Sequence, residues 1–307
     1  MKKLLYPFIL LLVLIISACS SQTSGKEESK PKKEEQSKTI TYQSENGPIE
    51  VPSNPKRVIL LSGFTGNVID LGVNIVGVDV WSKNNPTFKE ELKDVAEVSD
   101  ENLEKIIELE PDLIIGLSNI KNLDKLKEIA PTVTYTWGKA DYLTQHIEIG
   151  KLLNKEKEAQ AWVDDFKTRA KTVGDEIRSK IGEDATVSVI EAYDKDLYVF
   201  GNNWARGTEI LYQAMNLKMP DKVKEMALKS GYYTISAEVL PEYAGDYVIL
   251  SKYANADHSF QETETYKNIP AVKNNRVFEL NGNGASFSDP VTLDKQLDFF
   301  KKSFLGN

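Results

Sequence analysis

The sequence predicts an α/β protein with two lobes joined by one long helix, and three observations support this prediction. Short apolar runs alternate with helical stretches in both halves of the chain, a pattern typical of parallel sheets covered by helices. One helical register of roughly 40 residues interrupts this alternation near the middle. The chain beyond residue 38 also exceeds the usual size of one hydrophobic core. We expect lobes over residues 39–141 and 183–307, with a connecting long helix over 142–182.

The first residues predict a lipoprotein signal peptide over residues 1–18. Lys2 and Lys3 precede an almost unbroken apolar run, which is too short for a membrane span. Two small residues and then Cys19 follow in the order of a lipobox, so we expect Cys19 to be lipidated and to become the mature N-terminus. An ordinary signal peptide with a chance cysteine is the alternative. Cys19 is the only cysteine, which excludes an intramolecular disulfide and a structural thiolate metal site.

The segment over residues 19–38 predicts a disordered tether that carries the lipidated cysteine. It has no apolar side chains that could build a core, so it cannot offset the entropy of ordering. The whole chain has a net charge of -8, which argues against a nucleic-acid partner and against a basic membrane-docking surface. No second apolar run of spanning length appears, so we expect membrane contact through the lipid anchor only.

Strand and helix patterns alternate along both lobes. Prolines at positions 111 and 131 end two helices of the first lobe, each just before an apolar strand. The predicted strands are Val58–Leu61, Ile75–Val78, Leu113–Ile115 and Thr132–Tyr135 in the first lobe, and Thr186–Ile190, Leu197–Phe200, Asp246–Leu250 and Val277–Leu280 in the second. Helices over Ala205–Met215 and Pro290–Phe304 are expected in the second lobe.

The connecting helix is predicted from an apolar stripe with helical spacing. Its members recur every three or four residues, which places them on one face: Trp162, Phe166, Ala170, Val173, Ile177 and Ile181. Gly182 fits a helix C-terminus. Gly150 and Asn154 are positions at which the helix could instead break into two.

The stretch GNNWARG, residues 201–207, places a tryptophan and an arginine in a flexible loop. It follows the strand that contains Tyr198 and precedes a helix, so we expect Trp204 and Arg206 at the carboxyl edge of the sheet, where open α/β sheets bind ligands. Arginine supplies a rigid fork of donors for oxygen-rich ligands, and aromatic rings supply flat contact area. In the alternative, Arg206 pairs with a local carboxylate and Trp204 fills the interface between the lobes.

Three more aromatic residues follow predicted strands in the same way. Trp137 and Phe64 follow strands of the first lobe within a few residues, and Phe287 lies in the loop after the last strand. Any one of them is as consistent with core packing as with ligand contact. Their shared position after strand ends favours a common site.

Little in the sequence supports catalysis or direct metal binding. The chain has two histidines, and neither a Gly-x-Ser-x-Gly motif nor a phosphate-binding glycine loop occurs. We interpret His146 as a solvated helix residue and His258 as a loop residue, and we expect no protein-held metal. A surface-anchored enzyme stays open as an alternative, but it would need a nucleophile–base pair or a cofactor site.

The features above resemble the ferric-siderophore-binding lipoproteins of Gram-positive ABC importers, and within them the ferric-hydroxamate receptors (FhuD-like). The likeness runs from about residue 39 to the C-terminus and rests on DLYVFGNNWARG, EYAGDYVIL, PDLII, APTV and SDPVTLD. The resemblance implies two Rossmann-like lobes of the class III periplasmic-binding-protein type with a shallow interlobe cleft. It also implies a monomer, lipid-anchored on the outer face of the cell membrane, which delivers ferric hydroxamate siderophores to an ABC permease and its ATPase for iron uptake.

The resemblance implies roles for the cleft residues. Arg206 and Trp204 match positions that contact the iron–hydroxamate core, Tyr198 matches an aromatic beside them, and Trp137 lies near one that lines the opposite wall. Three hydroxamates saturate octahedral iron, so no intrinsic cofactor and no protein ligand to the metal is needed. Where relatives often have tryptophan before the x-x-Asp-Pro segment, this chain has Ser286, which predicts a thinner wall there.

The resemblance further implies docking residues and leaves the ligand class open. Glu104 and Glu238 match the acidic residues, one on each lobe, that pair with permease arginines. By sequence alone both are ordinary exposed helix glutamates. A catecholate siderophore, haem or cobalamin is the alternative ligand, but the single clear cleft arginine favours a near-neutral or cationic complex.

Overall fold

The computed structural model describes residues 38–306. The predicted signal peptide, Cys19 and all but the last residue of the predicted tether therefore lie outside the described residues. The described chain begins with an antiparallel hairpin, β1 (Thr39–Ser44) and β2 (Gly47–Pro52), which was not predicted. Within residues 38–306, no helix is both long enough and apolar enough to cross a membrane.

The N-terminal lobe contains a five-stranded parallel sheet in the order β5-β4-β3-β6-β7. Its strands are β3 (Val58–Leu60), β4 (Ile75–Val78), β5 (Ala96–Glu97), β6 (Leu113–Leu117) and β7 (Thr132–Tyr135). The helical segments between them are α1 (Thr65–Asp70), α2 (Val80–Lys83), η1 (Pro86–Phe88), α3 (Leu103–Glu108) and α4 (Leu123–Ile129). The predicted strands of this lobe and their parallel arrangement are confirmed.

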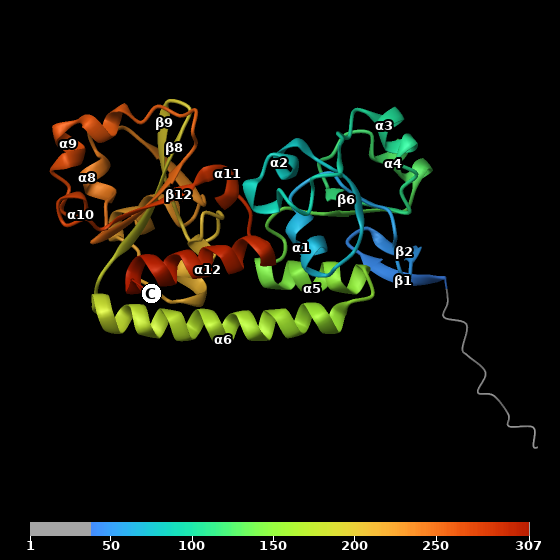
Figure 1. Ribbon diagram of the computed structural model, residues 1–307, viewed down its shortest axis with the longest axis horizontal. Helices are drawn as coiled ribbons and strands as arrows, with labels where there is room; N and C mark the ends of the chain where they lie inside the picture. The colour runs from blue at the N-terminus through green and yellow to red at the C-terminus, as the bar shows by residue number, and fades with distance from the viewer. Residues whose placement is uncertain (1–37, 307) are drawn as a thin grey trace, which may run out of the picture. The chain divides into compact units, whose positions relative to one another are not determined.

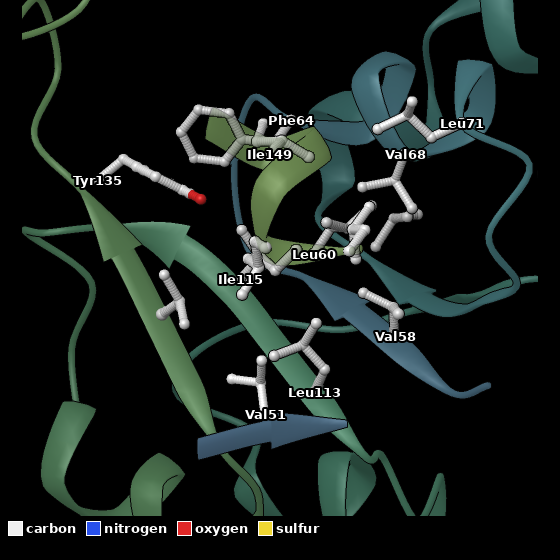
Figure 2. Packing of buried hydrophobic residues seen from close by; sticks show 14 of the residues in the cluster. Val51, Val58, Leu60, Phe64, Val68, Leu71, Leu113, Ile115, Tyr135 and Ile149 are labelled. Atoms are coloured by element: carbon white, nitrogen blue, oxygen red, sulfur yellow. The ribbon is translucent and has the colours of Figure 1, made fainter. Parts of the chain in front are cut away.

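Both faces of this sheet are buried, which explains why its strands are apolar without alternation. Leu60 and Ile115 belong to one core cluster, and their neighbours Ile59 and Ile114 belong to another on the opposite face. Figure 2 shows the first cluster, in which side chains of β3 and β6 lie beneath residues of α1 and α5 such as Ile149.

The predicted connection of the two lobes by one long helix is confirmed, and this helix is α6 (Glu156–Ile181). A shorter helix, α5 (Tyr142–Leu152), precedes it and packs against it (Figure 1). The predicted range 142–182 therefore spans two helices, and the break lies at the alternative positions. Asn154 has a left-handed backbone (φ 57°), and a Cβ at Gly150 would lie 2.6 Å from that of Ala159, so glycine permits the close approach of the two helices.

The stripe along α6 is confirmed, but the interpretation of His146 was wrong. Phe166, Ala170 and Ile177 are fully buried, and Gly182 follows the end of α6 with a positive φ. His146 is fully buried as well, because α5 packs on α1 as well as on α6. Its Nε2 lies 3.3 Å from a carboxylate oxygen of Asp70 at the end of α1.

The C-terminal lobe contains a five-stranded sheet in the order β10-β9-β8-β11-β12. Its strands are β8 (Val187–Tyr193), β9 (Asp196–Phe200), β10 (Tyr232–Ile235), β11 (Tyr247–Lys252) and β12 (Val277–Asn281). The helical segments are η2 (Glu209–Ala214, a π-helix), α7 (Asp221–Ala227), α8 (Leu240–Tyr243), η3 (Ser259–Glu262), α9 (Glu264–Lys267), α10 (Pro270–Lys273), α11 (Gly282–Ala285) and α12 (Pro290–Leu305). His258 directly precedes η3, in a loop as predicted.

This second sheet is mixed, so the stretch GNNWARG follows a different path from the one expected for a parallel sheet. β8, β11 and β12 are parallel, but β9 runs antiparallel to β8 after a tight turn at Asp194 (φ 53°). The carboxyl end of β9 therefore lies at the opposite end of the sheet from the carboxyl ends of β8 and β11. The expectation that the stretch reaches the carboxyl ends of the strands directly from β9 was wrong. The loop instead turns back, with left-handed conformations at Ala205, Arg206 and Gly207, and η2 begins only at Glu209.

The segment after β12 packs against both lobes. Phe287 and Val291 pack against the core of the N-terminal lobe, although both lie in the C-terminal third of the chain. Asp289 caps α12, and α12 then runs along α6 (Figure 1). The segment therefore joins the two lobes and does not belong to the C-terminal lobe alone.

Candidate ligand-binding site

A pocket of about 320 Å³ lies at the carboxyl end of β8 and contains most of the predicted residues. We call it the arginine pocket, and ten residues line it: Trp81, Glu191, Tyr193, Tyr198, Phe200, Trp204, Arg206, Tyr232, Tyr253 and Ser286. Seven of the ten are aromatic. Trp81 comes from α2 of the N-terminal lobe and the rest from the C-terminal lobe, so the pocket lies between the lobes.

The guanidinium of Arg206 is held by a carboxylate at the base of this pocket. Its Nε donates to Oε2 of Glu191 at 2.8 Å, and its Nη2 donates to Oε1 at 2.9 Å. Ser251 on β11 donates to the same carboxylate at 2.7 Å. The guanidinium carbon lies 5.0 Å from the ring centroid of Phe200, so an aromatic face and a carboxylate fix the side chain together.

The Arg206–Glu191 pair leaves the arginine pocket without a net charge from these two groups. Burial alone would lower the pKa of Arg206, but the hydrogen bonds and the negative charge of Glu191 raise it above its usual value, so Arg206 is always charged. Arg206 therefore pairs with a local carboxylate, as in the alternative given above. It also lines the pocket, so the two interpretations do not exclude each other.

Aromatic rings that contact one another form the walls of the arginine pocket. Trp204 lies 5.1 Å from Tyr232 between ring centroids, and Tyr193 lies 5.0 Å from Tyr253. Tyr198 contacts Tyr232 at 6.0 Å. Because side chains alternate along a strand, Tyr198 faces the core cluster on one side of β9, and its neighbours Leu197 and Val199 face the other.

The hydroxyl of Ser286 links the segment after β12 to Tyr253, which follows β11. This hydroxyl donates to the carbonyl of Gly282 at 2.7 Å and lies 2.5 Å from the hydroxyl of Tyr253. Because Ser286 donates its single proton to Gly282, Tyr253 is the donor to Ser286. This hydrogen bond holds the hydroxyl of Tyr253, which lines the arginine pocket together with Arg206 and Glu191.

A second pocket of about 150 Å³ adjoins the first, and we call it the phenylalanine pocket. Its lining residues are Gly63, Phe64, Asn67, Leu117, Thr136, Trp137, Gly138, Ala140, Tyr142, Gln145, Asn203, Glu209, Ser286, Phe287 and Ser288. Ser286 lines both pockets. The rings of Trp137 and Trp204, one from each pocket, meet edge to face with centroids 6.5 Å apart.

A buried carboxylate, Glu209, lines the phenylalanine pocket. Its Oε1 accepts hydrogen bonds from the backbone N–H of Ala205 and from Ser288, each at 3.0 Å, and its Oε2 lies 3.0 Å from the hydroxyl of Thr208. Burial raises the pKa of Glu209 above its usual value, and these hydrogen bonds oppose the shift.

The predicted ligand-contact residues therefore divide between two adjoining pockets. Tyr198, Trp204 and Arg206 line the arginine pocket. The other three line the phenylalanine pocket: Phe64, Trp137 and Phe287. Trp137 is 64% exposed, whereas Phe64 is 6% exposed and packs on Tyr135 (Figure 2), so Phe64 also serves the core.

The two predicted docking residues lie on the surface, one in each lobe. Glu104 is exposed in the first turn of α3. Glu238 is exposed in the turn before α8. The expectation that it lies in a helix was therefore wrong. Among residues 38–306, no group of three or more His, Cys, Asp or Glu side chains is placed to hold a metal ion.

Only three of the ten residues that line the arginine pocket were predicted as ligand contacts from the sequence. Trp81 follows β4 and Tyr253 follows β11, so the rule that selected Trp137 and Phe64 would have found both. Tyr193 ends β8 and satisfies the same rule. The role of Glu191 could not be predicted from the sequence. It is a carboxylate within an apolar strand, and its role becomes clear only when its partner Arg206 is known.

Comparisons with known proteins identify the family of this chain. A family model for periplasmic binding proteins matches residues 59–283. The chain is 35% identical over 274 residues to the iron(3+)-hydroxamate-binding protein FhuD of Bacillus subtilis, and the match covers 87% of each chain.

Two solved structures show the same fold. The FhuD protein from S. pseudintermedius matches with a TM-score of 0.77 and 34% identity, covering 88% of this chain and 99% of that one. FhuD2 from Staphylococcus aureus, solved with bound ferrioxamine B, matches with a TM-score of 0.78 and 33% identity over 82% of this chain and 99% of that one. The fold, the interlobe pockets and these matches together assign the chain to the periplasmic binding protein family, and the chain belongs to it.

Proposed function

We propose that this chain is a lipid-anchored substrate-binding protein that captures ferric hydroxamate siderophores and delivers them to an ABC permease for iron uptake. The relatives named for iron-hydroxamate binding support the ligand class. The observation that carries the proposal is the arginine pocket, whose aromatic walls surround one guanidinium already paired with a carboxylate.

The charge of the pocket favours a ligand without net negative charge. A ferric trihydroxamate is neutral, because three hydroxamate anions balance Fe(III), and it is cationic when its backbone carries an amine. Arg206 and Glu191 cancel each other, so the pocket presents no surplus cation to such a complex. A ferric catecholate carries net negative charge and would need further basic residues, so this alternative ligand is disfavoured.

The hydrogen-bonding capacity of Arg206 also fits a hydroxamate complex. A guanidinium has five N–H donors, and Arg206 uses three of them, on Glu191 and on the carbonyl of Trp204. The two remaining donors are available for oxygen atoms of the chelate. The iron keeps its six oxygen ligands from the siderophore, and the protein binds the outside of the complex.

The location and partners of the protein complete the proposal. We place the lipidated Cys19 in the outer face of the cell membrane, where a monomer would deliver its ligand to the permease. Glu104 and Glu238 would then pair with basic residues of the permease, one on each lobe, since both are exposed.

Quenching of tryptophan fluorescence tests the proposed ligand class. Trp81, Trp137 and Trp204 line the two pockets, so a coloured ferric complex bound there should quench most of the emission. We expect saturable quenching by ferrioxamine B and by ferrichrome below micromolar concentrations, and none by a ferric catecholate or by haem. Absence of quenching by every ferric hydroxamate up to tens of micromolar would contradict the proposal.

A further inference from the structure

The phenylalanine pocket combines a buried carboxylate with aromatic walls. Glu209 is 3% exposed, and the pocket beside it has a volume of about 150 Å³. Since roughly 10–15 Å³ of cavity holds one water molecule, this volume admits a short chain of heavy atoms. Phe64, Trp137 and Phe287 line the same space.

The carboxylate of Glu209 has only uncharged donors around it. A backbone N–H and two hydroxyl groups contact it, and no lysine or arginine among residues 38–306 forms an ion pair with it. Arg206 acts on Glu209 through its charge, but its hydrogen bonds go to Glu191 and to a backbone carbonyl. A buried carboxylate in such surroundings gains most from a cation delivered by a ligand.

The other lining groups suit an ammonium group on an alkyl chain. The faces of aromatic rings attract cations, and their surfaces cover methylene groups. The side-chain amide of Gln145 lines the pocket, and its buried Nε2 has no hydrogen-bond partner within the described chain. Rotation of this amide exchanges its nitrogen for its oxygen, so Gln145 can meet either a carbonyl or an ammonium group.

The two pockets are close enough for one ligand to occupy both. They share Ser286, and Trp137 and Trp204 meet across their boundary. A compact iron core in the arginine pocket would leave a flexible arm within reach of Glu209.

We infer that the phenylalanine pocket is a subsite for a primary ammonium arm of a linear ferric trihydroxamate, with Glu209 as its counter-ion. This inference rests on the proposed function and adds a preference within the ligand class. The protein then binds amine-bearing linear complexes more tightly than acylated or cyclic complexes that lack the charge.

Ferrioxamine B and its N-acetyl derivative provide a matched pair of probes. The two complexes share the iron core, and only the first carries an ammonium group. In fluorescence titrations of the intact protein, we expect ferrioxamine B to bind about tenfold or more tightly than the acetylated complex, as for a charge-assisted hydrogen bond.

The variant Glu209→Gln removes the negative charge of this side chain and keeps its shape. In this variant Oε1 still accepts from Ala205 and Ser288, and Nε2 donates to the Thr208 hydroxyl, whose own proton goes to the Ala205 carbonyl. We expect the ratio of the two affinities to fall to about one. Urea denaturation of E209Q checks independently that the variant is folded.

Three outcomes of these titrations would contradict the inference or the proposed function. Equal affinities for both complexes in the wild type would overturn the subsite and leave the proposed function standing. A preference that persists in E209Q would show that the acetyl group is excluded by its size, and this also overturns the role of Glu209. Binding of neither complex would contradict the proposed function itself.

Discussion

Arg206 and Glu191 form a two-hydrogen-bond ion pair at the base of the arginine pocket. The Arg206 side chain is 16% exposed and that of Glu191 is 3% exposed. Ser251 occupies a further lone pair of the carboxylate. The pair is therefore a fixed part of the pocket wall, and each partner depends on the other for its burial.

Glu191→Ala should strongly destabilise the protein. It removes the only carboxylate that contacts the guanidinium in the described structure and leaves a buried charge uncompensated. We expect the free energy of unfolding to fall by about 3–5 kcal/mol, measured by urea denaturation at pH 7. Glu108→Ala, which breaks an exposed pair with Lys105, is the control and should cost less than about 1 kcal/mol. Similar losses for both variants would contradict the structural role of the pair.

Arg206→Lys should weaken ligand binding although it keeps the positive charge. An ammonium group cannot donate two parallel hydrogen bonds to Glu191 and still present N–H groups to the ligand as the planar guanidinium does. We expect the Kd for ferrioxamine B to rise about tenfold or more in fluorescence titrations. Arg169→Lys on α6, which lines neither pocket, should leave the Kd unchanged. An unaltered Kd in R206K would exclude Arg206 from ligand contact.

The parts of the fold that the sequence predicts well are those in which burial determines the pattern. Strands such as β3 and β6 are covered on both faces, so their residues are continuously apolar and easily recognised. The carboxyl edge of this parallel sheet then places Phe64 and Trp137 correctly beside one pocket.

The errors arise where a turn decides the direction of the chain. β9 has the composition of a parallel strand, and only the tight turn at Asp194 makes it antiparallel. The return of the loop to Arg206 requires left-handed backbone at Ala205, which residue composition does not indicate. His146 was misplaced because its neighbours on α1 and α6 come from distant parts of the chain.

Charge reversal at the two proposed docking residues should separate transport from binding. Glu104→Lys and Glu238→Lys place positive charge where we propose contact with basic residues of the permease. We expect uptake of radiolabelled ferrioxamine B by cells carrying either variant to fall about tenfold or more. The Kd of the isolated protein should not change, because neither residue lines a pocket. Glu90→Lys and Glu262→Lys, exposed residues of the two lobes, are the controls, and equal loss of uptake in them would contradict specific docking.

Asp289 should make the stability of the protein fall with rising pH. Burial raises its pKa from 3.8 to about 6, against hydrogen bonds from Thr292 that lower it. Between these pH values the folded state keeps a proton that the unfolded state releases, so the stabilisation is complete below pH 3.8 and is lost as the pH rises through about 6.

The variant Asp289→Asn isolates this contribution. Asparagine is also a good N-cap, so Thr292 keeps its partner while the ionisable group is removed. The difference in free energy of unfolding, wild type minus D289N, should decrease by about 2 kcal/mol between pH 4 and pH 7. Urea denaturation at several pH values measures it, and a difference independent of pH would show that Asp289 does not titrate in this window.

Gly66→Ala should destabilise the junction between α1 and α12, because the space beside Gly66 cannot hold a methyl group. A Cβ at this position would lie 1.7 Å from Oδ1 of Asp289, which is 1% exposed and held by Thr292. We expect a loss of about 2–3 kcal/mol, the upper range of overpacking costs. The three atoms nearest to this Cβ all belong to the carboxyl group of Asp289, so the same substitution in an Asp289→Ala background should cost much less. Additive losses in the double variant would mean that Gly66 is needed for another reason, such as the backbone of α1 itself.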